Sequence, residues 1–444
     1  MTKRSKASVA QANKKQLSRY KFWLIVIPAI ALFIKFIVIG NTQAGGWLGA
    51  DGENYLTGVD GLLKDGFFST EGKLIYWPAG YPLFVWPFAK LSLTHFIYFI
   101  SYVQSILFAF ATYSFTKSLS QTKVSNIAIW ASVLISFNPT LSLSSLAIGY
   151  ESPISSLLMI TSAYILKDLL LGKTKHSSIF LVISGLCLSI AVFFQPRIIL
   201  FAFALTLIWA LSKEGHLVKF KISAILLILT MLFPSLLVIR NVVANGQATI
   251  STNLGVTMRI GAGDNATGGY GAPDGSIPCP PAIAGQAVTD NQVVICVLKW
   301  YQKNPKKALK LIVSKSRYYW SPWFGPEANG TMARNPWLKV SPLVGFTKNK
   351  EGFDLVYGPV GKLVSLMWVI GGMLLIALGL RKVWSLGGLE RQLSWLIGAP
   401  VLLGWLISLG TIGDHRFRIP QMGLSLALQL LGVMLIRDRV TRRG

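Results

Sequence analysis

The stretch from residue 22 to residue 40 reads FWLIVIPAIALFIKFIVIG and contains a single charge, Lys35. Its length is close to the roughly 20 apolar residues with which an α-helix crosses the hydrocarbon of a bilayer. Similar runs recur along the chain and predict an all-α polytopic membrane protein with about ten spans. The spans are expected near 22–40, 95–116, 126–147, 150–171, 177–195, 197–212, 221–240, 356–380, 392–410 and 417–436.

The composition agrees with a membrane protein. A mean hydropathy of +0.53, with 52% hydrophobic and 14% charged residues, excludes a soluble globular protein of this length. The net charge of +26 suggests nucleic-acid binding, but the lysines and arginines concentrate in the termini and in short connections such as 117–123 and 213–221. That distribution is the positive-inside bias of membrane proteins, with some attraction to anionic membrane lipid. It predicts both termini in the cytoplasm and no nucleic-acid partner.

The chain divides into a basic cytoplasmic tail at 1–21, a transmembrane domain at 22–436 and a second basic tail at 437–444. No clear cleavage site closes the first hydrophobic run, so we expect a retained signal anchor. Two external connections are long, the loops 41–94 and 241–355.

Both external loops are expected to carry short interfacial helices. Residues 54–64 place apolar side chains along one helical stripe. Residues 77–87 combine prolines with tryptophan and tyrosine, as is typical of segments in the membrane interface. Residues 290–315 predict a basic surface helix that is interrupted at Asn304-Pro305.

The predicted topology sorts the ionisable residues near the spans to one side. With the N-terminus inside, the outer face receives Asp51, Glu53, Glu151, Arg197, Arg240, Asp264, Asp414, His415, Arg416 and Arg418. We therefore expect a polar site at the outer membrane–water boundary.

Carboxylates at this boundary suit a general base that acts on a sugar or lipid hydroxyl. Asp51 and Glu53, just beyond the first span, are the candidates for catalysis. The alternative interpretation is that Asp51 caps the 54–64 helix. Glu151 opens the fourth span as a helix-dipole partner, a second active-site acid, or a ligand for a divalent cation shared with Asp51.

Arginine holds phosphate oxygens through two parallel hydrogen bonds. The candidate phosphate-binding residues at outer span ends are Arg197, Arg240, Arg416 and Arg418. The alternative for each is a side chain that snorkels to the interface. The lysines of 299–315 are a further candidate for phosphate binding, or form a solvated basic face.

Three more observations leave alternatives open. His415 could bind phosphate or a metal, but one histidine gives no metal signature, so no cofactor is assigned and metal dependence stays open. Cys279 and Cys296 share an external loop, where an oxidising compartment permits a disulfide worth about 3 kcal/mol; two free thiols are the alternative. Secondary candidates for positioning substrate are Tyr55, Glu151, Asp264, Asp414 and His415.

An ordered series of motifs resembles the GT-C superfamily of membrane glycosyltransferases. The series runs Asp51-x-x-x-Tyr55, Trp77-Pro-Ala-Gly-Tyr-Pro-Leu-Phe84, Gln195-Pro-Arg197, Arg240-Asn241, Ile250-Ser-Thr-Asn-Leu-Gly255, Gly261-x-x-Asp264-x-Ala-Thr-Gly-Gly-Tyr270, Asn304-Pro305 and Arg416-Phe-Arg418-Ile-Pro420. It is most similar to the bacterial branch related to protein O-mannosyltransferases and the lipid A aminoarabinose transferase.

The resemblance implies a donor sugar on a polyprenyl phosphate and an acid in the first external loop, at Asp51, that activates the acceptor. It also implies basic residues near the donor phosphate and an enzyme in the bacterial cytoplasmic membrane, with its active site facing the exterior. The partners would be membrane lipid, the lipid-linked donor and an envelope acceptor, and transfer would invert the anomeric carbon. The rival hypotheses are a transporter or lipid-linked-sugar flippase, and a non-catalytic scaffold.

Overall fold

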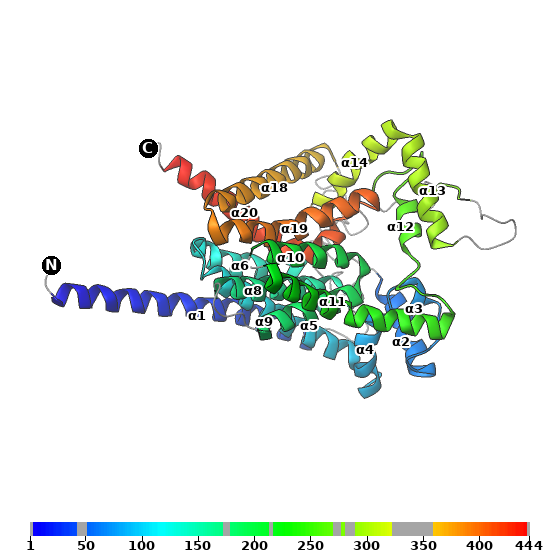
Figure 1. The fold of residues 1–444 in the computed structure, drawn as a ribbon, viewed down its shortest axis with the longest axis horizontal. Helices are drawn as coiled ribbons and strands as arrows, with labels where there is room; N and C mark the ends of the chain where they lie inside the picture. Colours follow the sequence, from blue (N-terminus) through cyan, green and yellow to red (C-terminus); the bar gives the residue numbers. More distant parts are fainter. Residues whose placement is uncertain are drawn as a thin grey trace.

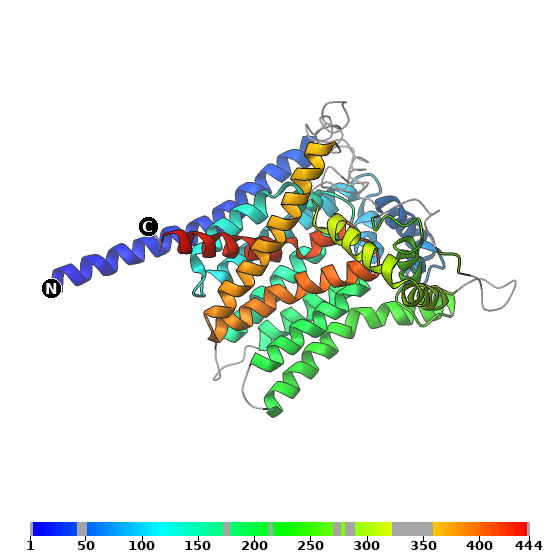
Figure 2. The ribbon, with the colours of Figure 1, turned by 90° about the horizontal axis from the view of Figure 1, so that it is seen from above.

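The computed structural model describes residues 3–41, 51–171, 178–212, 216–269, 277–279, 289–321 and 358–441. These parts of the chain are mainly helical and contain no β-strand, which confirms the all-α prediction. Both termini lie at one end of the helix bundle, and α2, α3, α12 and α13 lie at the opposite end (Figures 1 and 2).

Seven helices of the described residues are long and apolar enough to cross a membrane. They are α1 (Lys3–Asn41, of which Tyr20–Asn41 is the apolar part), α5 (Phe96–Leu119), α8 (Glu151–Leu170), α11 (His216–Asn245), α18 (Pro359–Ser385), α19 (Gly388–Gly410) and α20 (Ile419–Val440). An eighth span arises if α6 (Ala128–Phe137) and α7 (Pro139–Leu143), which are bent against each other, count as one.

The remaining two predicted spans are the short helices α9 (Ser178–Phe194) and α10 (Ile199–Ser212). The chain breaks between them at Gln195, whose backbone is extended before Pro196, as proline disfavours helix at the preceding residue. A count of ten full spans is therefore not confirmed, although the described part of each predicted stretch is mainly helical.

Helix α8 lies at the centre of the bundle, packed against α5, α9 and α20. It is buried along most of its length, whereas α18 and α11 expose most of their apolar surface. Small residues such as Ser152, Ser155 and Ser156 are fully buried along it, as expected where helices approach closely inside a membrane. This packing fixes the first residue of α8, Glu151, in the interior.

The first external loop forms three helices, α2 (Gly52–Asp65), α3 (Lys73–Tyr76) and α4 (Gly80–Leu91). Tyr55, Val59 and Leu62 of α2 are buried, so the predicted amphipathic helix is present. Arg240 of α11 holds this loop in place, because its guanidinium donates hydrogen bonds to the carbonyls of Phe67, Ser69 and Leu74.

The second external loop contributes α12 (Leu254–Ile260), α13 (Asp290–Lys303) and α14 (Pro305–Trp320), with the predicted interruption at Asn304. A disulfide joins Cys279 to Cys296 beside a small apolar core under α12 and α13. Asp290 accepts a hydrogen bond from Gly255 N at 2.7 Å, which fixes the start of α12 against α13.

Residues 411–418 form a strap between α19 and α20. α14 packs directly against this strap, because a Cβ at Gly413 would overlap the Lys315 backbone. Lys315 Nζ also donates to Leu409 O, in the last turn of α19, at 3.0 Å. The strap ends in a short 3₁₀ turn, His415–Arg418, from which α20 begins.

Candidate functional site

A cavity of about 840 Å³ lies where the external helices meet the bundle. Its charged lining includes Asp51 before α2, Arg197 before α10, Asp290 of α13, and Asp414 and Arg416 of the strap. Segments from distant parts of the sequence thus meet in one space, and four of the sequence-predicted site residues share it.

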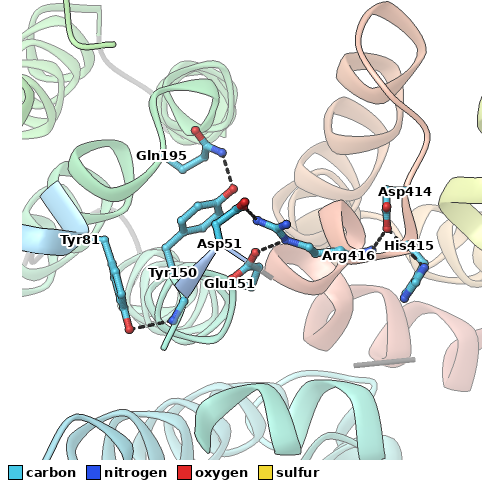
Figure 3. A network of polar contacts seen from close by, with 9 residues as sticks. Asp51, Tyr81, Tyr150, Glu151, Gln195, Asp414, His415 and Arg416 are labelled. Carbon is cyan, nitrogen blue, oxygen red and sulfur yellow. Dashed lines mark hydrogen bonds and ion pairs between the residues drawn. The ribbon is translucent and has the colours of Figure 1, made fainter. Parts of the chain in front are cut away.

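Arg416 is the centre of the polar network in this cavity (Figure 3). Its Nε donates to Glu151 Oε1 at 2.5 Å, its Nη2 donates to Asp51 Oδ2, and its backbone N–H donates to Asp414 Oδ1 at 2.9 Å. The side chain of Glu151 is 2% exposed and that of Asp51 is 17% exposed. Of the two carboxylates bound to Arg416, Asp51 is therefore the one that faces the cavity. Glu151 holds the guanidinium from the buried side.

Asp51 occupies the N-cap position of α2, but its side chain makes no capping hydrogen bond. The carboxylate is instead bound to Arg416, 365 residues later in the chain. The Asp51 side chain therefore does not cap α2. It lines the cavity and binds Arg416.

Arg197 also lines the cavity, with its guanidinium 4.2 Å from the centre of the Phe417 ring. Stacking on an aromatic face holds a guanidinium in place while leaving its edge for hydrogen bonds. Two arginines thus contribute to one space, from the break before α10 and from the strap.

The other two candidate arginines lie elsewhere and are not among the described residues that line the cavity. Arg240 is fully buried and bound to backbone carbonyls. Arg418 donates to Trp320 O at 2.7 Å and lies over the Trp320 ring. In this structure both side chains connect elements of the fold.

The remaining candidates take varied positions. Glu53 is exposed on α2, and Asp264 is exposed in an ion pair with Lys307 at 2.8 Å. His415 is buried, 3.3 Å from Asp414. In the described parts of the chain, no group of three His, Cys, Asp or Glu side chains could hold a metal ion, and the two carboxylates considered for a shared cation both bind Arg416.

Three further residues around the site, Tyr81, Tyr150 and Gln195, were not among the predicted site residues, although Tyr81 and Gln195 belong to the motifs quoted above. Gln195 donates to Tyr150 OH at 2.8 Å, and Tyr81 OH accepts from Gly149 N at 2.9 Å (Figure 3). Burial raises the pKa of Tyr150, Tyr55 and Tyr81, so all three remain neutral hydroxyls. In the sequence, Tyr150 could have been found because it precedes Glu151, and Gln195 because it lies two residues before Arg197. For Tyr81 the only sequence signal was its aromatic motif.

One wall of the cavity is apolar. It is built by Ile199 and Leu200 of α10, Val238 of α11 and Ile407 of α19, and Leu200 is 48% exposed. The same cavity thus combines a charged floor with a hydrocarbon-like side formed by helices of the bundle.

No protein-family model and no curated protein matches this sequence. Among solved structures, the chain is similar to the Archaeoglobus fulgidus oligosaccharyltransferase in the apo form, at 11% identity and a TM-score of 0.48, over 94% of this chain and 51% of that one. It is also similar to the archaeal oligosaccharyltransferase AglB from Archaeoglobus fulgidus in complex with an inhibitory peptide and a dolichol-phosphate, at 12% identity and a TM-score of 0.43, over 94% and 51%. This chain spans about half the length of those proteins.

Proposed function

We propose that this protein is a membrane glycosyltransferase that moves a sugar from a polyprenyl-phosphate donor to an acceptor hydroxyl. The observation that carries the proposal is the shared cavity, which combines the partly exposed carboxylate of Asp51 with two arginines, Arg197 and Arg416, and an apolar wall. These are the parts that transfer from a lipid-borne phosphate requires.

The donor would lie with its isoprenoid chain along the apolar wall and its phosphate at the arginines. An enzyme with a lipid-linked donor needs no soluble nucleotide-binding fold, because the donor reaches a site at the end of the spans by diffusing in the bilayer. Arg197 and Arg416 would bind the phosphate oxygens, and Glu151 would keep the Arg416 guanidinium in its plane.

The transfer step would be a direct displacement at the anomeric carbon. The acceptor oxygen attacks while Asp51 takes its proton, and the bond between the anomeric carbon and the phosphate oxygen breaks. The phosphate leaves with the electron pair, stabilised by Arg197 and Arg416, and the anomeric carbon is inverted. Phosphate is already a good leaving group because its second pKa is about 6, so the base and the fixed positive charge carry the catalysis.

We place this cavity on the exterior side of a bacterial cytoplasmic membrane. The support is the basic character of the tails and of the short connections, with both termini at the end of the bundle opposite the external helices (Figure 1). The acceptor would be an envelope protein, lipid or glycan.

The experiment is to reconstitute the purified protein in vesicles with a panel of radiolabelled undecaprenyl-phosphate sugars and a membrane-envelope extract. Transfer of label to an acceptor, with release of undecaprenyl phosphate, supports the proposal. Movement of labelled lipid between leaflets without cleavage of the sugar bond supports the flippase alternative instead. If the lipid is neither cleaved nor moved, both hypotheses are refuted.

A further inference from the structure

The hairpin of α13 and α14 carries an exposed surface that the proposed transfer reaction does not use. Its apolar part consists of Ile295, Leu298, Leu309, Ile312 and Val313, each at least 40% exposed. Its basic part consists of Lys299, Lys303, Lys306, Lys307 and Lys310, all exposed. We call these ten residues the hairpin surface. Within 290–320, Asp290 is the only acidic residue.

Helix α14 separates its side chains into three faces. Leu311, Lys315 and Tyr319, spaced by four residues, are buried against the protein. Leu309 and Val313 form an exposed aliphatic stripe, and Lys306 and Lys310 form a basic stripe beside it. A soluble surface helix would expose only polar residues opposite its buried face. An exposed aliphatic stripe with lysines along its edge is instead typical of a helix lying in a membrane interface.

Contacts to two spans place α14 at the end of the hydrocarbon region. Trp405 Nε1 of α19 donates to Ser316 Oγ at 3.1 Å. The hydroxyls of Ser321, just after α14, and Ser365 of α18 lie 3.0 Å apart. α14 lies next to the ends of both spans (Figure 1). α14 therefore lies beside two of the helices that are long and apolar enough to cross a membrane.

We propose that the hairpin surface binds anionic phospholipid of the surrounding bilayer. The aliphatic side chains would enter the boundary between headgroups and acyl chains, and Lys299, Lys303, Lys306 and Lys310 would contact lipid phosphates. Charge complementarity decides the occupant: aliphatic side chains alone fit any lipid, but a row of lysines with almost no acidic counterpart favours a headgroup with net negative charge. Lys307 already has an acidic partner in Asp264, which leaves the other four lysines for the lipid.

Lipid bound here would act on the strap that carries Asp414 and Arg416. Trp320 O of α14 accepts a hydrogen bond from Arg418 of the strap, and Lys315 Nζ of α14 donates to Leu409 O in the last turn of α19, directly before the strap. Gly413 packs against the Lys315 backbone too closely for any side chain. Since α14 and the strap are joined in this way, fixing α14 to the bilayer surface would also reduce the motion of the strap.

The test is amide hydrogen exchange of the full-length protein in nanodiscs of phosphatidylcholine alone and of phosphatidylcholine with phosphatidylglycerol. The anionic discs are expected to slow exchange about fivefold or more, both in 292–318 and in the strap. Replacing three lysines, Lys303→Gln, Lys306→Gln and Lys310→Gln, should remove this difference. The matched control is Lys64→Gln, Lys73→Gln and Lys90→Gln, which deletes the same charge from the first external loop and should keep the difference.

Equal exchange in the two kinds of disc overturns the proposal, and so does a difference that survives the Lys303, Lys306 and Lys310 replacements. Slower exchange confined to 292–318, without the strap, supports lipid binding but overturns the connection to the strap. No sugar donor is present in these measurements, so failure of the proposed transfer reaction would not affect them.

Discussion

Arg416 donates its Nε hydrogen to Glu151 Oε1 across 2.5 Å, which joins the start of α8 to the strap before α20. The two residues are 265 positions apart in the sequence. Because α8 is the most deeply buried of the candidate spans among the described residues, this contact joins the cavity floor to the centre of the bundle. Arg416 then reaches Asp51 from a fixed base, which keeps the candidate carboxylate in one orientation.

Breaking this pair should cost far more stability than breaking a surface pair. Arg416→Gln leaves two buried or half-buried carboxylates without their shared cation, so we expect the free energy of unfolding to fall by about 3–5 kcal/mol. Lys307→Gln breaks the exposed pair with Asp264 and should cost less than about 1 kcal/mol. Denaturant unfolding in detergent measures both. An equal fall in the free energy of unfolding for both variants would show that the buried Arg416 network does not hold α8 to the strap.

Arg240 is expected to affect stability and not donor binding. Arg240→Met removes the donor from three carbonyls of the first external loop, and buried acceptors left unpaired should lower the free energy of unfolding by about 2–4 kcal/mol. Arg439→Met, at an exposed position, is the control and should change little. For the folded fraction of the Arg240→Met protein, the KM for the lipid-linked donor should stay near the wild-type value. A large rise in KM at unchanged stability would restore Arg240 as a phosphate ligand.

Much of the fold follows from the sequence because the membrane imposes it. Long apolar runs must be helical, so the helices, the break at Gln195-Pro196 and the interruption at Asn304 were all predictable. The ends of α9 and α10 also lie within two residues of the predicted stretches 177–195 and 197–212, but the sequence did not show that helices of this length fall short of a full span. Site membership was the hardest part. Arg197, Arg240, Arg416 and Arg418 look alike at span ends, and only packing shows that two line the cavity while two bind backbone carbonyls.

Lys315 should make stability depend on pH in a defined direction. Burial lowers its pKa to about 7 from the ordinary 10.5, so between these values the unfolded chain binds a proton that the folded protein does not. The free energy of unfolding therefore rises with pH in this window, by up to about 1.4 kcal/mol per pH unit. Tyr301, which accepts its hydrogen bond, has a pKa of about 12 and stays neutral there.

The measurement is thermal unfolding of wild type and Lys315→Met at pH 7 and pH 9. The Lys315→Met protein lacks this titrating group, so its stability should rise less between the two pH values than that of the wild type. The same pH dependence in both proteins would show that Lys315 is protonated in the fold throughout.

The disulfide should stabilise the part of the cavity lining that α12 and α13 provide. Closing a loop with a sequence separation of 17 between Cys279 and Cys296 contributes about 3 kcal/mol in the chain-entropy account. Cys279→Ser with Cys296→Ser should therefore speed hydrogen exchange in α12 and α13, while α8 exchanges as in the wild type. Unchanged exchange in α12 and α13 would show that their small apolar core suffices.

The most direct test of the central claim is the initial rate of sugar transfer by the Asp51→Asn protein, once a donor sugar has been identified. Asparagine keeps the size of the side chain and a hydrogen-bond acceptor for Arg416 but cannot take the acceptor proton, so we expect transfer to fall at least about 10²–10⁴-fold, with membrane insertion intact. Glu53→Gln, two residues away on the exposed side of α2, should transfer at close to the wild-type rate. Full activity of Asp51→Asn would contradict the assignment of the base and, with it, the proposed mechanism.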